Sequence, residues 1–108
     1  MTNSIADTNS SSDIDSFLDS VWMEQGLAKN TLSAYRSDLT ILEKWTKKKN
    51  LMLRKISRAD LLDFISERAN LGSSARSSAR QLSTFRRFYN YLYQQEIISQ
   101  NPTIKISM

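Results

Sequence analysis

The side chains best suited to chemistry with an anion are arginines in one stretch of the sequence, Ser73 to Gln95. Arg76, Arg80 and Arg87 recur at intervals that place them on one side of a helix, at about 100° per residue. The stretch has no Asp or Glu, although a solvated helix usually mixes acids and bases because i,i+4 ion pairs stabilise it. Guanidinium groups beside small hydroxyl and amide side chains suit phosphates and the edges of nucleic-acid bases. The pattern therefore favours contact with a nucleic acid, and a plain solvated helix face is the alternative. The row consists of Arg76, Arg80, Ser83, Arg87, Asn90 and Gln94, with Arg86 on its shoulder.

A second row of similar composition lies within residues 29–50, where cations again alternate with small hydroxyl side chains. Its line contains no acid, since Asp38 and Glu43 lie to one side of it. A solvated face is an equally good interpretation here, because a lysine run such as residues 47–49 is typical of a charged helix end that complements the helix dipole. The row consists of Ser33, Arg36, Ser37, Thr40, Lys44 and Lys47.

Apolar residues at helical spacing predict four helices that would position these rows, and therefore an all-α fold. The first helix is expected to begin near Asp13, with Ser12 as its N-cap, and to end at Gly26. The preceding residues 1–12 are small and polar, and they are predicted to form a disordered tail. The apolar positions of this helix are Ile14, Phe17, Leu18, Val21 and Trp22.

The other three helices have recognisable ends. Asn30 or Thr31 can cap the second helix, and Asn50 tolerates the left-handed geometry that would end it. Ser57 and Asp60 have the spacing of a capping box at the start of the third. The fourth helix spans the arginine stretch, and its predicted buried stripe is Leu82, Phe85, Phe88, Tyr89 and Leu92.

The end of the chain is expected to leave the helical domain. Ile97 and Ile98 predict one more short packed turn or helix after the fourth. Asn101-Pro102 then breaks regular structure, because Pro has no N–H and disfavours helical geometry in the residue before it. We therefore predict an ordered domain over residues 13–101, followed at residues 102–108 by the start of a linker.

The net charge of +4 conceals an asymmetry. Residues 1–28 hold five acids and no Lys or Arg, whereas residues 29–108 hold all 15 basic residues against six acids. Charge sorted in this way indicates a polyanionic partner for the later part of the chain and solvent for the first helix.

Several kinds of chemistry are excluded by composition. The 108 residues contain no His and no Cys, and there is no Gly-rich phosphate loop. We therefore expect no metal site, no cofactor and no catalytic residues in this chain. No apolar run is long enough for a membrane span and no signal peptide is recognisable, so the chain is predicted to be cytoplasmic and to have no membrane partner.

Two strings match a known family in order and spacing. Residues 30–39 read N-T-L-x-A-Y-x-x-D-L, and residues 77–92 read S-x-x-R-x-L-S-x-x-R-x-F-Y-x-Y-L. Together with Asn101-Pro102 they resemble the Xer-type tyrosine recombinases, the group that includes phage integrases. The resemblance covers about residues 14–104. The XerD-like branch is nearest, with a XerC-like protein and a phage or transposon integrase left open.

The resemblance implies a four-helix SAM-like core-binding domain, similar to the N-terminal domain of lambda integrase. In the family, the second and fourth helices lie against the major groove of double-stranded DNA, and a separate catalytic domain closes the clamp. That domain carries arginines, a lysine, a His-x-x-Arg pair and a tyrosine nucleophile after the Asn-Pro exit. The sequence is therefore interpreted as the amino-terminal portion of a recombinase that works as a tetramer on DNA, with the isolated domain a monomer.

The predicted contacts combine the two rows with the family's use of these helices. Cations near the helix ends are expected to hold phosphates, whereas Arg80 and Ser83, in mid-helix, are candidates for base edges. Tyr91 lies beside the basic row and is a weaker candidate for a DNA contact. The alternative is a helical protein-interaction module, which predicts exposed apolar surface or patches of opposite charge. The predicted DNA-binding residues are Thr31, Ser33, Arg36, Ser37, Lys44, Arg76, Ser77, Arg80, Ser83 and Arg87.

Overall fold

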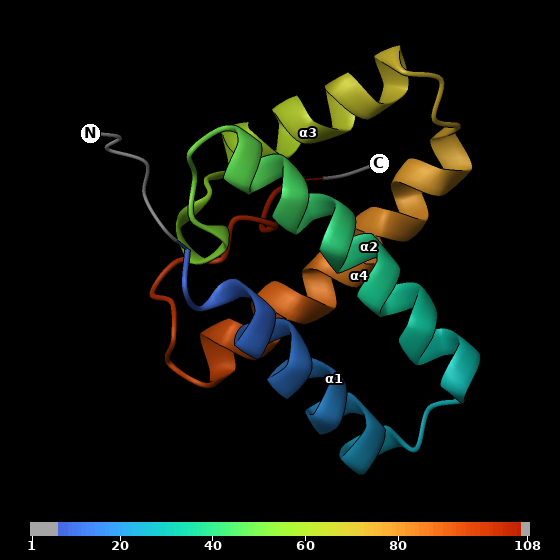
Figure 1. Ribbon diagram of the computed structural model, residues 1–108, viewed down its shortest axis with the longest axis vertical. Helices are drawn as coiled ribbons and strands as arrows, with labels where there is room; N and C mark the ends of the chain where they lie inside the picture. Colours follow the sequence, from blue (N-terminus) through green and yellow to red (C-terminus); the bar gives the residue numbers. More distant parts are fainter. Residues whose placement is uncertain (1–6, 107–108) are drawn as a thin grey trace. The chain divides into compact units, whose positions relative to one another are not determined.

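Four α-helices and one short 3-10 helix make up the regular structure of residues 7–106, the part of the chain that the computed structural model describes (Figure 1). The all-α prediction is confirmed, since these residues contain no strand. The chain divides into two compact units, with the boundary in the sequence after Lys55. The elements are α1 (Ser10–Gln25), α2 (Lys29–Lys48), η1 (Leu53–Lys55), α3 (Arg58–Asn70) and α4 (Ala75–Gln94).

The first unit is built on α1 packed against α2. Gly26 ends α1 with φ of 58°, and its N–H donates to the carbonyl of Trp22 as predicted for a helix C-cap. The ring centroids of Phe17 and Tyr35 lie 6.2 Å apart, which joins the two helices. Trp22 was predicted to be buried but is 61% exposed. It lies about 80° around the helix from Ile14, at the edge of the buried stripe.

The start of α1 differs from the prediction. The helix begins at Ser10 after Asn9, and not near Asp13 after Ser12. Ser10 Oγ donates to Glu43 Oε2 at 2.5 Å, and the carboxylate of Asp7 accepts from the backbone N–H of Leu53 at 2.9 Å. These contacts with distant residues offset the ordering entropy of a small polar segment. Residues 1–6 of the predicted disordered tail lie outside the described residues.

The start of α2 also corrects a prediction. Its N-cap is Ala28, and neither Asn30 nor Thr31 caps it, because both already lie inside the helix. The end of α2 is as predicted: Asn50 follows the last turn with φ of 59°, the left-handed geometry that Asn tolerates.

Asp13 and Arg54 form a buried ion pair within the first unit. Arg54 Nε lies 2.7 Å from Oδ2 of Asp13, and Arg54 Nη2 lies 2.9 Å from Oδ1. Asp13 is only 5% exposed, and this fork of two hydrogen bonds compensates for the burial of its carboxylate. The hydrogen bond with Asp13 raises the pKa of the Arg54 guanidinium above its ordinary value.

Replacing Arg54 by Met is therefore expected to destabilise the chain by about 2 kcal/mol. This loss of stability is smaller than is typical of a fully buried ion pair, because the Arg54 side chain is still 32% exposed. Unfolding in urea measures the loss, with Lys55→Met at the exposed neighbouring position as the control. Equal midpoints for the two variants would contradict a structural role for the pair.

The second unit is built on α3 and α4. Ser57 and Asp60 form the predicted capping box: Ser57 Oγ accepts from the Asp60 N–H at 3.1 Å, and Asp60 Oδ2 accepts from the Ser57 N–H at 2.8 Å. The rings of Phe64 and Phe85 meet edge to face, with centroids 5.6 Å apart. Of the predicted short turn or helix after α4, the described residues show turns only. Five side chains of α4 are completely buried, and they are the predicted stripe: Leu82, Phe85, Phe88, Tyr89 and Leu92.

Candidate nucleic-acid interface

The exposed side of α4 carries the predicted arginine row. Arg76, Arg80, Ser83 and Arg87 are all exposed, and they lie opposite the stripe that contains Phe85. At a rise of about 1.5 Å per residue, Arg76 and Arg87 are separated by about 16 Å along the helix axis. The major groove of B-DNA is about 12 Å wide. A helix with this spacing can therefore present cations to both edges of the groove and two mid-row side chains to the bases between them.

Ser77 has a different place from the rest of the α4 set. It is half-buried at the start of the helix, where its N–H donates to Ser74 Oγ at 3.1 Å. The hydroxyl of Ser74 in turn donates to Ser77 Oγ at 3.2 Å. Ser77 thus belongs to the N-terminal cap of α4, which fixes the orientation of the first turn and of Arg76 beside it.

The α2 row is also exposed over most of its length. Ser33, Ser37 and Lys44 are exposed, whereas Thr31, a predicted contact outside the row, is half-buried. Arg36 is exposed too, but its Nη1 lies 2.9 Å from Oδ1 of Asp15 on α1. The sequence pattern missed this partner because it was sought along the helix and not on the neighbouring one. Any phosphate contact by Arg36 would compete with this carboxylate.

Five positions of the α2 row correspond to five positions of the α4 row when the sequence is shifted by 43 residues. In α4 the row begins with arginines at its first two positions, where α2 has serines. Cations of the α2 row are concentrated in its second half, and one of them, Lys47, has its Nζ 3.6 Å from Glu43 Oε2. Positive charge in the α4 row therefore extends from its first position to Arg87, whereas in the α2 row it is confined to the second half, except for Arg36. The equivalent positions are Ser33 and Arg76, Ser37 and Arg80, Thr40 and Ser83, Lys44 and Arg87, and Lys47 and Asn90.

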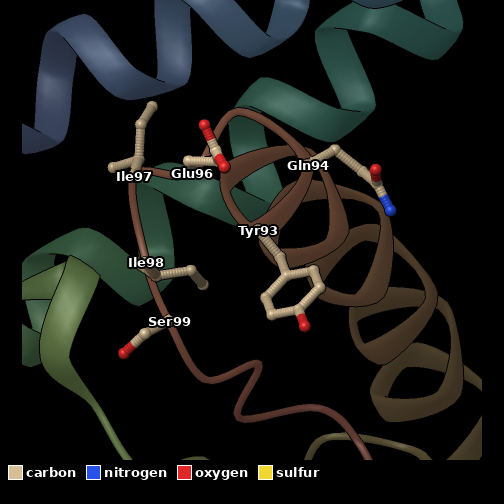
Figure 2. Close-up of a pocket in the computed structure, with 6 residues that line it drawn as sticks. All are labelled: Tyr93, Gln94, Glu96, Ile97, Ile98 and Ser99. Atoms are coloured by element: carbon tan, nitrogen blue, oxygen red, sulfur yellow. The ribbon is translucent and has the colours of Figure 1, made fainter.

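An open hollow of about 620 Å³ lies at the end of α4 (Figure 2). Ile98 points toward the ring of Tyr93, whereas Ile97 points away from it. Tyr93 is 46% exposed, so the hollow offers an aromatic surface, and the carboxylate of Glu96 also lines it. Within residues 7–106, no cluster of three His, Cys, Asp or Glu side chains could hold a metal ion. Across the same residues, no helix has the length and apolar character to cross a membrane.

The helices and their exposed rows define a small all-α domain of the SAM-like class. Residues 14–96 match the family described as the phage integrase N-terminal SAM-like domain, and the chain belongs to that family. This confirms the resemblance drawn from the two sequence strings.

Individual relatives identify a more specific group of proteins that the chain resembles. The chain is 45% identical over 94 residues to tyrosine recombinase XerD of Proteus mirabilis, an alignment that covers 87% of this chain and 30% of the relative. It is 44% identical over 93 residues to XerD of Shewanella oneidensis, covering 86% and 31% of the two chains. For XerD of Pseudomonas aeruginosa, identity is 42% over 95 residues, covering 88% and 32%. The chain thus resembles XerD recombinases and spans about a third of their length.

Proposed function

We propose that this chain is the DNA-binding domain of a site-specific tyrosine recombinase, and that it grips duplex DNA in the major groove with α2 and α4. The observation that carries the proposal is the exposed α4 row, in which three arginines accompany the hydroxyl group of Ser83 on the side opposite the core. Such a row supplies phosphate contacts at its ends and hydrogen-bond donors for base edges in its middle.

The role of the whole protein follows from the relatives' names and stays a proposal for this chain. Strand breakage and rejoining would be performed by residues beyond those present here, since the 108 residues include no His for the family's His-x-x-Arg pair. The complete recombinase would act as a tetramer on DNA in the cytoplasm, in integration or in chromosome dimer resolution. The isolated domain would be a monomer.

The Arg80→Ala variant distinguishes sequence-specific recognition of bases from non-specific electrostatic binding to DNA. If the Arg80 guanidinium forks onto a guanine edge, its loss costs about 1–3 kcal/mol on the proper site and much less on random DNA. Lys44→Ala should weaken binding to both duplexes by similar factors and reduce the salt slope by about one, as expected for a phosphate contact. Binding of each variant to specific and scrambled duplexes, at two salt concentrations, measures the difference.

A matched control for Arg80 is Arg58→Ala, since Arg58 is exposed at the start of α3 and outside both rows. It should change neither affinity nor specificity. Equal losses on the two duplexes for Arg80→Ala would make Arg80 a phosphate contact. A large drop in its melting temperature would contradict the exposed position on which the proposal depends.

A helical protein-interaction module is the second candidate function. It is favoured by exposed apolar side chains, namely Trp22 and Met23 near the end of α1, and by the hollow beside Tyr93. A module of this kind would bind duplex DNA no better than a protein of equal net charge does. The duplex titration described above therefore separates the two functions.

A further inference from the structure

The segment after α4 returns to that helix and packs against it. Arg86 Nη2 donates a hydrogen bond to the backbone carbonyl of Ile106. Asn101 Oδ1 accepts from the N–H of Thr103 at 2.9 Å and from its hydroxyl at 2.6 Å, which closes the turn that starts the return. Thr103 and Ile106 are both buried. Residues 101–106 are therefore held by the second unit, and the described part of the predicted linker is fixed to the domain.

An open hollow of about 580 Å³, here called the exit hollow, lies between the last half of α4 and this returning segment. Three of its lining residues are cations and two carry side-chain amides, whereas no acid lines it. Amide N–H groups and cations together are donors that match the oxygens of a phosphate group. The lining residues are Arg86, Arg87, Asn90, Asn101, Thr103, Ile104, Lys105 and Ile106.

Lys105 has a backbone geometry that its residue type disfavours. Its φ is 70°, in the left-handed region, where a side chain with a Cβ costs about 1 kcal/mol or more. Asn or Gly would occupy this position with less strain. The sequence instead places a cation at the rim of a hollow that already contains two arginines. An unfavourable backbone residue of this kind points to a function for its side chain.

The exit hollow is continuous with the α4 row. Arg87 and Asn90 belong to that row and also line the hollow. From Arg80 to Asn90 the rise along the helix is about 15 Å, so the hollow lies beyond the positions expected over the bases. A group bound there would be at the edge of the groove, where the phosphate backbone runs.

We propose that the exit hollow binds a phosphate group of the DNA backbone. Arg87 and Lys105 contact the phosphate, and Arg86 is a positioning residue whose hydrogen bond to Ile106 holds Lys105 at the rim. The inference rests on the proposed function, to which it adds a second DNA-contacting element, the segment 101–106, that neither sequence row contains.

Lys105→Asn is the variant that tests the proposal. It removes the charge and suits the left-handed backbone, so the melting temperature should stay equal to that of the parent or rise. Affinity of the 108-residue chain for a short duplex should fall about tenfold at low salt, and the log–log salt slope should become shallower by about 0.9. Lys48→Asn is the matched control, since Lys48 is an exposed lysine that lies outside both rows and the hollow.

Arg86→Met tests the positioning role through its coupling with Lys105. If Arg86 acts by holding the segment, Lys105→Asn should cost little further affinity in the Arg86→Met chain, because Lys105 is already displaced. Losses that simply add would overturn the positioning role. Melting temperatures of both single variants show whether either loss reflects unfolding.

The outcomes separate this inference from the proposed function. A Lys105→Asn chain that binds like the parent, while Arg80→Ala is impaired, would overturn the exit hollow and leave the α4 interface standing. If the parent chain itself fails to bind duplex DNA, titration with inorganic phosphate followed by amide NMR tests whether the exit hollow binds an anion. Shifts confined to residues 86–90 and 101–106, lost in Lys105→Asn, support an anion site, and their absence overturns it.

Discussion

Raising the salt concentration from about 50 to about 200 mM is expected to weaken binding of this chain to duplex DNA by about 500-fold. Five cations are predicted to contact phosphates, four in the two rows and one in the exit hollow, and each neutralised phosphate contributes about −0.9 to the slope of log affinity against log salt. The slope is then about −4.5, which corresponds to about 4 kcal/mol over this fourfold change. The contributing side chains are Arg36, Lys44, Arg76, Arg87 and Lys105, since Arg80 is predicted to contact a base edge.

The ion pair between Arg36 and Asp15 allows a sharper version of this measurement. If the carboxylate keeps Arg36 in the complex, only four cations contribute, the slope is about −3.6, and the loss is about 150-fold. Asp15→Asn releases Arg36, because the two side chains meet at 2.9 Å, and should then steepen the slope by about 0.9. Asp19→Asn is the matched control, since Asp19 is an exposed acid of the same helix. Affinity that stays constant across this salt range would contradict phosphate contact as the main source of binding.

The features that could be predicted from the sequence are those with a local cause. The buried stripe of α4 was predicted completely, because apolar spacing along a helix reports directly which side faces the core. The capping box of Ser57 and Asp60 was predicted for the same reason, since both partners lie within one turn. Exposure of Arg76, Arg80 and Arg87 follows from their position opposite this stripe. Contact of these side chains with DNA stays a prediction.

The features that could not be predicted depend on residues far apart in the sequence. The early start of α1 depends on Glu43, which accepts from Ser10 and Ser11 across more than thirty residues. The hydrogen bond from Arg86 to Ile106 likewise joins residues 20 positions apart. Periodicity identifies the buried side of a helix but does not name the partner that packs there. The exit hollow is formed by this return of the chain, and it could not be predicted from the sequence for that reason.

Phe85→Ala should destabilise the chain by about 4 kcal/mol, a large part of the stability of a domain of this size. Phe85 is completely buried, and its ring meets Phe64 of α3 edge to face at 5.6 Å between centroids. Removing it leaves a cavity and also ends this edge-to-face contact with α3. The loss corresponds to a fall of about 20 °C in melting temperature.

Ser83→Ala is the control for this core variant, because Ser83 lies two residues earlier and therefore on the opposite side of α4. As an exposed side chain it should change stability by no more than about 0.5 kcal/mol, although it is a candidate for a base contact. Urea and thermal unfolding of the two variants measure the contrast between the core face and the arginine face. Similar losses of stability would mean that α4 is rotated about its axis from the orientation described. The arginine row would then not face outward, which would contradict the proposed contact with the DNA groove. A stable Ser83→Ala chain with weakened specific binding would instead assign the two faces of one helix to folding and to DNA recognition.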